Sequence, residues 1–192
     1  MLVLAAILIE NQLKELREHA LKIGEQMGVK CPLKVLPMHV SLKKGIEIDQ
    51  PRLESCVDEI CALYSKTEPF SVEVEGPELS DGIVWLRLKE NKILSDLHSA
   101  LVDLSKNKFG IEPNELDSVF KFHSTIFMDN EKDLGPAFEE LKQVNLPQKI
   151  TVRHFMIGTS ENGKPEGYSV FKHFSLGPDI SIKEEWERFE GK

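Results

Sequence analysis

The sequence has few cysteines and no motif in which they would hold a metal. The three cysteines, Cys31, Cys56 and Cys61, are odd in number and do not show a metal-ligand spacing. Cys56 and Cys61 fall on an expected amphipathic helix, where buried free thiols are common. We therefore expect structural thiols, no metal and no cofactor. The absence of a disulfide pattern favours a reducing compartment.

The sequence also lacks a hydrophobic run long enough to span a bilayer. The apolar segment Leu2–Ile9 is much too short, and it lacks the positive leader and small-residue cleavage site of a signal peptide. It ends at Glu10 and is typical of a strand that is buried on both faces. We therefore expect a cytoplasmic protein that does not bind a membrane.

Positive charge is scarce in this chain. The sequence has 24 Lys and Arg against 32 Asp and Glu, a formal net charge of −8 and a pI near 5.3. This balance argues against a protein that grips long stretches of nucleic-acid backbone, because such binding depends on clustered Lys and Arg. It is still compatible with a small phosphate ligand in a local positive pocket. The 192 residues contain no low-complexity linker, which indicates one compact unit over residues 1–192.

Two parts of the chain show the same order of expected elements, namely strand, helix, strand, helix, strand. Corresponding elements are offset by about 80–84 residues. We interpret residues 2–76 and 83–158 as an internal duplication that forms two lobes with a cleft where they meet. A closing strand and a short helix follow within 168–189. The expected strands are 2–9, 34–43, 70–75, 83–88, 119–128 and 149–158, and the expected helices are 10–28, 91–108, 131–144 and one from about residue 51.

Each half contains one strand with a histidine, any residue, a hydroxyl residue and an aliphatic residue. These are His39-Val-Ser41-Leu42 and His123-Ser-Thr125-Ile126. Residues two apart on a strand point to the same face, so each histidine shares a face with its hydroxyl residue. A single such pair is usually no more than two polar residues at the surface. Two copies at corresponding positions of a duplicated unit favour one shared site.

Two histidines and two hydroxyl groups suit phosphoryl transfer without a metal. A neutral imidazole accepts a proton from the attacking water, and a protonated one donates a proton to the leaving oxygen. Histidine suits both roles because its pKa lies near neutrality. The hydroxyl groups of Ser41 and Thr125 can donate hydrogen bonds to the nonbridging phosphate oxygens as charge shifts in the transition state.

The paired motifs resemble the signature of the 2H phosphoesterase superfamily, also called the 2′-5′ RNA ligase-like family. The likeness covers nearly the whole chain and includes a closing pattern that runs from Tyr168 to Leu176. The chain departs from the family pattern in two places. Met38 separates Pro37 from the first histidine, and Ser124 occupies a position that is usually aliphatic. The resemblance implies a bilobal α+β fold, with antiparallel sheets and outer helices around a central cleft.

Four further residues are candidates for substrate binding. Period two places Lys43 and Lys121 on the histidine faces, where either can hold a phosphate or be a solvated lysine. Phe127 shares the face of Thr125 and either stacks on a base or packs in the interior. Tyr168, at the start of the last strand, can reach a ligand. The remaining histidines read as surface or structural residues: His19, His98, His154 and His173.

The leading hypothesis is a phosphodiesterase without a metal or other cofactor, with His123 as base and His39 as acid, or the reverse. The resemblance implies action on 2′,3′-cyclic phosphates of a nucleotide or RNA 3′ end, or on 2′-5′ linkages, and hence a role in RNA processing. The alternatives are RNA 2′-5′ ligase activity, a nucleotide-binding or RNA-end-binding protein without turnover, and a structural or regulatory scaffold. No obligate protein partner is expected, and the oligomeric state is not readable.

Overall fold

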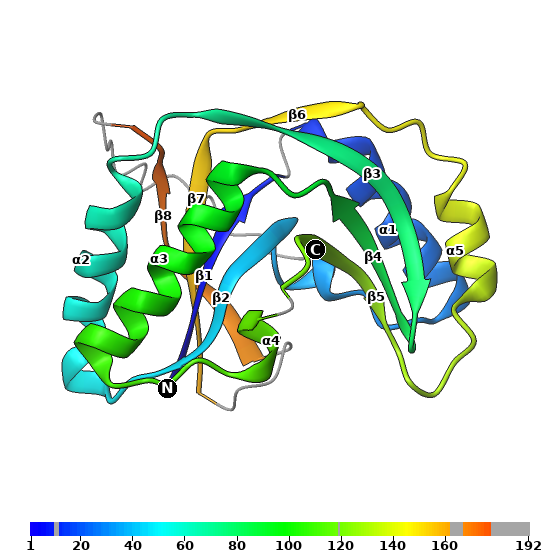
Figure 1. Cartoon of the computed structure of the whole chain (residues 1–192). Coiled ribbons are helices and arrows are strands. Elements are labelled where there is room, and N and C mark those ends of the chain that lie inside the picture. The colour runs from blue at the N-terminus through cyan, green and yellow to red at the C-terminus, as the bar shows by residue number, and fades with distance from the viewer. Residues whose placement is uncertain (10–11, 119, 162–166, 178–192) are drawn as a thin grey trace.

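The chain folds as two four-stranded antiparallel sheets with helices around them, which confirms the α+β prediction (Figure 1). The computed structural model describes residues 1–9, 12–118, 120–161 and 167–177. Both sheets are antiparallel throughout, and we call them the first and the second sheet. In order across the first sheet lie β2 (His39–Glu47), β1 (Leu2–Leu8), β7 (His154–Ser160) and β8 (Tyr168–Ser175). Across the second lie β5 (His123–Met128), β4 (Ile83–Leu88), β3 (Phe70–Ser80) and β6 (Lys149–Val152).

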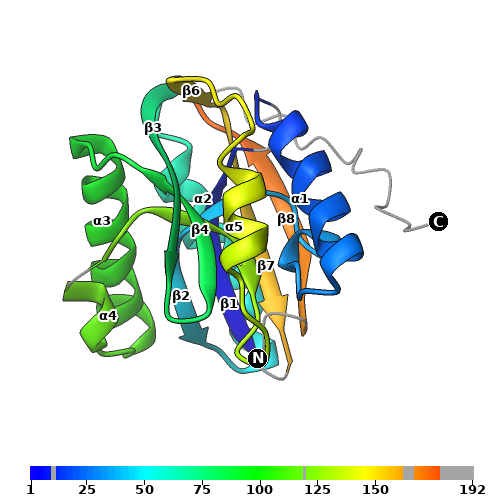
Figure 2. The ribbon, with the colours of Figure 1, turned by 90° about the vertical axis from the view of Figure 1, so that its right-hand side faces the viewer.

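Helices pack against strands of both sheets. Helix α3 packs against β2 and α2, while α5 packs against β3 and α1. In Figure 2 the strands lie between α3 and α4 on one side and α1 on the other. The helices are α1 (Lys14–Met27), α2 (Leu53–Tyr64), α3 (Lys92–Phe109), α4 (Glu115–Ser118) and α5 (Gly135–Leu141), with the 3-10 turns η2 (Pro32–Lys34) and η3 (Gln50–Arg52).

The helix predictions follow from apolar side chains at helical spacing. On α1, Leu16, Ala20 and Ile23 are buried in the main core, as the pattern predicts. Gly28 ends this helix in the left-handed conformation that glycine adopts without a Cβ penalty. The predicted helix over 131–144 is shorter than expected, because α5 covers only Gly135–Leu141.

The two sheets do not coincide with the two repeats, so the expectation that each repeat forms its own lobe needs correction. In both sheets the motif strand lies at the edge and pairs with the first strand of its own repeat. The third strand comes from the other repeat: β7 pairs with β1, and β3 pairs with β4. The last strand of each repeat is therefore exchanged, and neither sheet is complete without both halves.

A tight turn explains why β3 lies in the second sheet. Asp81 and Gly82, which the sequence suggests only as part of a loop, have φ of 47° and 74° and join Ser80 to Ile83 as a two-residue hairpin turn. Positive φ at both central residues is typical of the type I′ turn, for which Asp-Gly is a preferred pair. The predicted strand 70–75 consequently continues to Ser80 and pairs with β4.

The exchange in the other direction occurs at Arg153. The predicted strand 149–158 is divided there into β6, which pairs with β3, and β7, which pairs with β1. Tyr64 of α2 stacks on Phe155 of β7 with ring centroids 4.0 Å apart, and Phe155 stacks on Phe174 of β8 at 4.9 Å. This aromatic stack holds the exchanged strand in the core of the first sheet.

The remaining general expectations concern thiols, membranes and the end of the chain. Cys31 and Cys56 are buried and Cys61 is half-buried, all three as free thiols, and burial raises the pKa of Cys56 and of Cys61 to about 11. Within the described ranges, no helix combines the length and apolarity needed to cross a bilayer. The closing strand is β8, and the predicted short helix up to residue 189 lies outside the described residues.

Candidate active site

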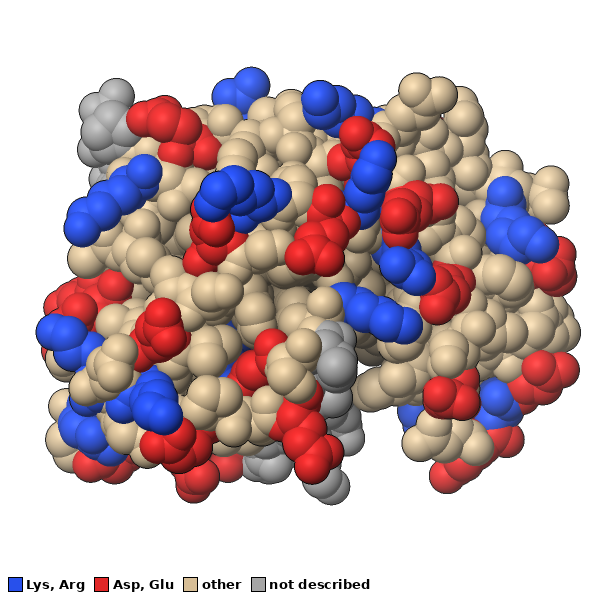
Figure 3. All heavy atoms as spheres, viewed as in Figure 1, with Lys and Arg blue, Asp and Glu red and all other residues tan. Residues whose placement is uncertain are grey.

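The two motif strands lie next to each other although they belong to different sheets. Strand β2 is the edge of the first sheet, β5 is the edge of the second, and the two are in contact. Each begins at its histidine, His39 or His123, a few residues later than the sequence pattern suggests. In Figure 1 the strands come closest near the middle of the molecule and diverge toward its lower edge. In the same view the outline of the molecule is indented at its lower edge (Figure 3).

The alternation predicted for the first three residues of each motif is present. His39 and Ser41 are half-buried while Val40 between them is buried. His123 and Thr125 are likewise half-buried, and Ser124 between them is buried. The histidine and the hydroxyl residue of each motif therefore share a partly accessible face, as period two requires.

Both strands then depart from period two at the same place. In each, one residue directly after the hydroxyl residue is unpaired, which makes a β-bulge at Leu42 in β2 and at Ile126 in β5. A bulge reverses the facing of the residues beyond it. The pairs that flank the bulges are Ala6↔Ser41 and Ala5↔Lys43 in the first sheet, and Trp85↔Thr125 and Val84↔Phe127 in the second.

The bulges overturn two of the predicted substrate contacts. Lys43 has a side chain that is only 1% exposed, and its Nζ lies 2.6 Å from Oδ2 of Asp117. It is neither a solvated lysine nor a group facing a phosphate. Phe127 is completely buried in the main core, close to Gly24 of α1, so its ring is not available to stack on a base.

The two imidazoles are held in the same way. Nδ1 of His39 lies 2.8 Å from the carbonyl oxygen of Pro37, and Nδ1 of His123 lies 2.7 Å from that of Lys121. A carbonyl oxygen only accepts, so in both rings Nδ1 carries the hydrogen. The neutral form of each histidine therefore has an unprotonated Nε2, which is the nitrogen left to exchange a proton with a substrate.

Electrostatics lower the pKa of both histidines. For His39 the largest cause is burial, which the hydrogen bond to Pro37 opposes, and the positive charges of His123 and Lys44 lower it further. For His123 burial again dominates; Lys44 and Arg87 lower the pKa further, while Glu78 raises it. Because β2 and β5 are in contact, the charge of His123 acts on His39 across the two strands.

Sequence reasoning missed three residues around the pair. Lys44 is exposed and acts on both histidines, because the bulge moves it to the position expected for Lys43. The ring of Trp85 lies 4.8 Å from that of His123, centroid to centroid, at an interplanar angle of 42°. Arg87 pairs with His123 across the strands and forms ion pairs with two glutamates of β3. Period two along β4 places Trp85 and Arg87 on one face, so this signal was present in the sequence.

The other predicted contacts lie at different distances from the histidine pair. Lys121 is exposed; its carbonyl orients His123, and its charge helps to lower the pKa of Glu78. Tyr168 lies on β8, three strand spacings or about 14 Å from β2. It is 5% exposed, and its buried hydroxyl has no hydrogen-bond partner among the described residues. It belongs to a small apolar cluster with Ala6 and Leu8, which are the neighbours of Ser41 and His39 on β1.

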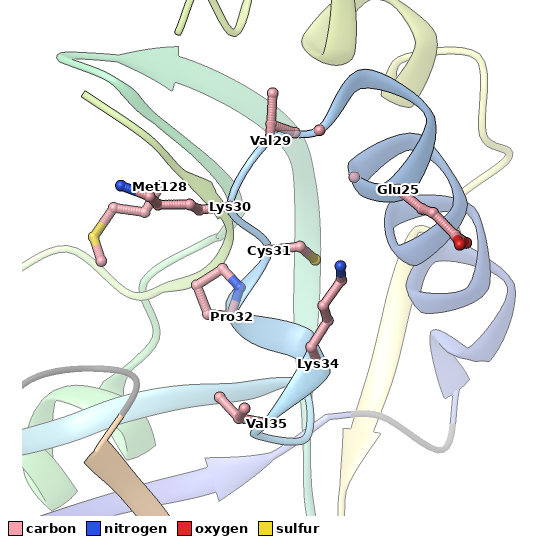
Figure 4. A pocket seen from close by; sticks show the side chains of 10 residues that line it. Glu25, Val29, Lys30, Cys31, Pro32, Lys34, Val35 and Met128 are labelled. Atoms are coloured by element: carbon pink, nitrogen blue, oxygen red, sulfur yellow. The ribbon is translucent and has the colours of Figure 1, made fainter. Parts of the chain in front are cut away.

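A separate pocket of about 610 Å³ lies at the end of α1 (Figure 4). Its walls come from that helix end, the segment 28–35 and Met128. None of the predicted site residues lines it. On the face shown in Figure 3, Lys and Arg are interspersed with Asp and Glu and do not gather into a single positive surface. Among the described residues, no group of three or more His, Cys, Asp or Glu is placed to hold a metal ion.

Comparison with known proteins places this geometry in a family. The model of the 2′-5′ RNA ligase superfamily matches residues 9–164. A candidate phosphoesterase of Oceanobacillus iheyensis is 26% identical over 153 residues, which cover 76% of this chain and 83% of that protein. The crystal structure of TT0787 of Thermus thermophilus has a TM-score of 0.64 at 20% identity, covering 92% of this chain and 98% of that one. E. coli LigT complexed with 3′-AMP has a TM-score of 0.56 at 16% identity, covering 91% and 97%. The chain therefore belongs to the 2′-5′ RNA ligase superfamily of 2H phosphoesterases.

Proposed function

We propose that this protein is a metal-independent phosphodiesterase that opens the 2′,3′-cyclic phosphate of a nucleotide or an RNA 3′ end. Cleavage of 2′-5′ linkages is the second reaction in its range. The observation that carries the proposal is the matched anchoring of the two imidazoles, each of which donates from Nδ1 to a carbonyl and leaves Nε2 for proton transfer. A binding site alone does not need two proton carriers held in this way.

In the proposed reaction water attacks the phosphorus of the cyclic phosphate in line with the bond that breaks. Nε2 of neutral His123 accepts a proton from the water as the new P–O bond forms. Protonated His39 donates from Nε2 to the ribose oxygen as its bond to phosphorus breaks. One proton enters the pair and one leaves it, so a proton exchange with solvent restores the starting state. The roles of the two histidines can be exchanged without changing this balance.

The charge on the phosphate is stabilised by groups on both strands. Ser41 and Thr125 lie on the faces of His39 and His123, where their hydroxyl groups can donate to the nonbridging oxygens. Lys44 supplies positive charge that reaches both histidines. A bound phosphate dianion or monoanion in turn favours the protonated imidazole, which offsets the effect of burial on its pKa.

The substrate we propose is small or terminal. The net charge of −8 and the mixed charges over the face in Figure 3 do not favour a long nucleic-acid track. LigT, which shares the fold, has been crystallised with 3′-AMP, with ATP and with NADP+. These ligands are nucleotides, which supports a nucleotide at the terminus as the part of the substrate that is recognised.

The test is a screen of 2′,3′-cyclic nucleotides, 2′-5′ dinucleotides and RNA 3′ ends, each with and without EDTA. We expect hydrolysis that EDTA does not reduce and that falls by at least 10²-fold in His39→Ala and in His123→Ala. His19→Ala, on the exposed face of α1, is the matched control and should leave the rate unchanged. Full activity of His123→Ala, or its abolition by EDTA, would contradict the proposal.

A second substrate separates the acid from the base. An ester with a p-nitrophenolate leaving group needs little protonation as it departs, so the variant that lacks the acid should lose much less activity on it than on a ribose ester. The variant that lacks the base should lose the same factor on both. If His123→Ala rather than His39→Ala is the variant that recovers, the two roles are the reverse of those proposed.

A further inference from the structure

A buried polar cluster lies on the opposite face of β2 from His39. It consists of Lys43 on β2, His98 on α3 and Asp117 on α4. Nζ of Lys43 and Oδ2 of Asp117 are 2.6 Å apart, and the same oxygen accepts the backbone N–H of Asn114 at 2.9 Å. The ion pair is desolvated, since the two side chains are 1% and 7% exposed. The cluster takes no direct part in the proposed chemistry.

His98 is the member whose contacts reach both β2 and the segment before β5. Its Nδ1 lies 2.6 Å from the carbonyl oxygen of Leu42, which is the bulge residue directly after Ser41. Its Nε2 lies 3.0 Å from the carbonyl oxygen of Asp117. The ring of His98 therefore lies between the backbone of β2 and that of α4.

The ring of His98 also contacts the segment that leads into the second motif. It stacks on Phe120 with centroids 4.3 Å apart at 20°, and it meets Phe122 edge to face at 6.5 Å. Phe122 directly precedes His123. Stacked and edge-to-face contacts are the arrangements that aromatic rings prefer. One side chain thus connects the bulge of the first motif with the approach to the second.

We propose that His98 is a positioning residue that sets the spacing of His39 and His123. The carboxylate of Asp117 and the ammonium of Lys43 are the charged groups beside it, and they keep α4 in place relative to β2. A side chain without the ring of His98 loses the contacts to Phe120 and Phe122, and with them the connection between the two motifs. The effect of this spacing on turnover rests on the proposed function. The role of His98 in setting the spacing does not depend on that function.

The first measurement reads the spacing without any turnover. Trp85 lies beside His123, and an imidazolium quenches indole fluorescence more than a neutral imidazole does. A reporter of His123 alone is not enough, because the charge of His123 acts on His39 and lowers its pKa. His123→Ala removes that charge, so the titration midpoint of His39, followed through the NMR signals of its ring, should rise. The size of this rise measures the coupling of the two histidines.

We expect this midpoint shift to fall by at least half when His98→Gln is introduced. His19→Gln, the same change at an exposed histidine, should leave it intact. Lys44 also acts on His39, but it is present in every variant and cancels in the comparison. An unchanged shift in folded His98→Gln would overturn the proposal, as would the absence of any shift in the parent protein.

Two further results complete the test. Phe120→Leu removes the ring on which His98 stacks and should reduce the same midpoint shift, so an unchanged shift in this variant would refute the proposal even if His98→Gln does not fold. On a substrate that the protein hydrolyses, His98→Gln should lower kcat by at least 10-fold with little change in KM, because small misplacements of proton donors are costly. If no substrate is hydrolysed but the coupling still depends on His98, the proposed function fails while the positioning role stands.

Discussion

Replacing Lys43 by methionine separates two explanations of this residue. The strand pattern places this lysine on the histidine face, where it either binds phosphate or is solvated. In the structure its ammonium lies 2.6 Å from Asp117, with the two side chains 1% and 7% exposed. Methionine fills nearly the same volume but has no charge, so Lys43→Met leaves the carboxylate of Asp117 buried without its cation. The first explanation predicts a raised KM at normal stability, and the second predicts a loss of stability.

The magnitude follows from the burial. Breaking a buried ion pair by removing one partner costs about 3–5 kcal/mol, because the remaining charge is desolvated and uncompensated. With a urea m-value of about 2 kcal/mol/M, the unfolding midpoint should fall by roughly 2 M. Lys43→Met with Asp117→Asn removes both charges and should recover most of this loss, since neutral replacement of a buried pair is often tolerated.

The assay is urea unfolding followed by circular dichroism, with Lys92→Met as the matched control. Lys92 pairs with Asp96 on the surface of α3, where the side chains are 84% and 61% exposed. Such a pair contributes at most about 1 kcal/mol, so the control midpoint should move little. If Lys43→Met unfolds at the same urea concentration as Lys92→Met and instead raises KM, the buried pair does not exist in solution and the strand pattern was right.

Four other predictions follow from the site. Burial lowers the pKa of both His39 and His123 below the ordinary value of 6.5. The bell-shaped pH profile of kcat/KM should therefore have its optimum on the acid side of pH 6.5. An optimum above pH 7 would contradict the lowered pKa values. The same lowered pKa values make a contribution to folding stability that is complete above the pKa of the unfolded chain and is lost as pH falls through the pKa values of the folded protein. Thermal unfolding between pH 7 and pH 4 measures this loss, and the His39→Ala/His123→Ala double variant should not show it. Ser124→Ala should raise the free energy of unfolding by up to about 1 kcal/mol, since it deletes a buried hydroxyl that has no partner among the described residues. If urea unfolding shows instead that the free energy of unfolding falls by more than about 1 kcal/mol, the hydroxyl makes a hydrogen bond in solution. Tyr168→Phe should not reduce stability, because the hydroxyl that it deletes also has no partner among the described residues. A raised KM in this variant would therefore identify the hydroxyl as a ligand contact. An unchanged KM would exclude Tyr168 from the site.

The local periodicity of the sequence was sufficient to predict which residues of each motif share a face. His39 with Ser41 and His123 with Thr125 share half-buried faces, because the facing of a side chain on a strand is decided by its immediate neighbours. The equal order of elements in both halves was sufficient to place the motifs on corresponding strands. These features depend on residues close together in the sequence, and a linear pattern records them directly.

Only the tertiary structure decided which residues surround the motifs. The bulges at Leu42 and Ile126 depend on pairing with β1 and β4, which no pattern within β2 or β5 reveals, and they turn Lys43 and Phe127 inward and bring Lys44 to the site. The exchange of β3 and β7 between the sheets likewise depends on long-range pairing, since β3 pairs with β4 and β7 pairs with β1. The residue types thus determined what chemistry the site can perform, while the pairing of strands distant in sequence determined which side chains take part, because register and contact are properties of two segments at once.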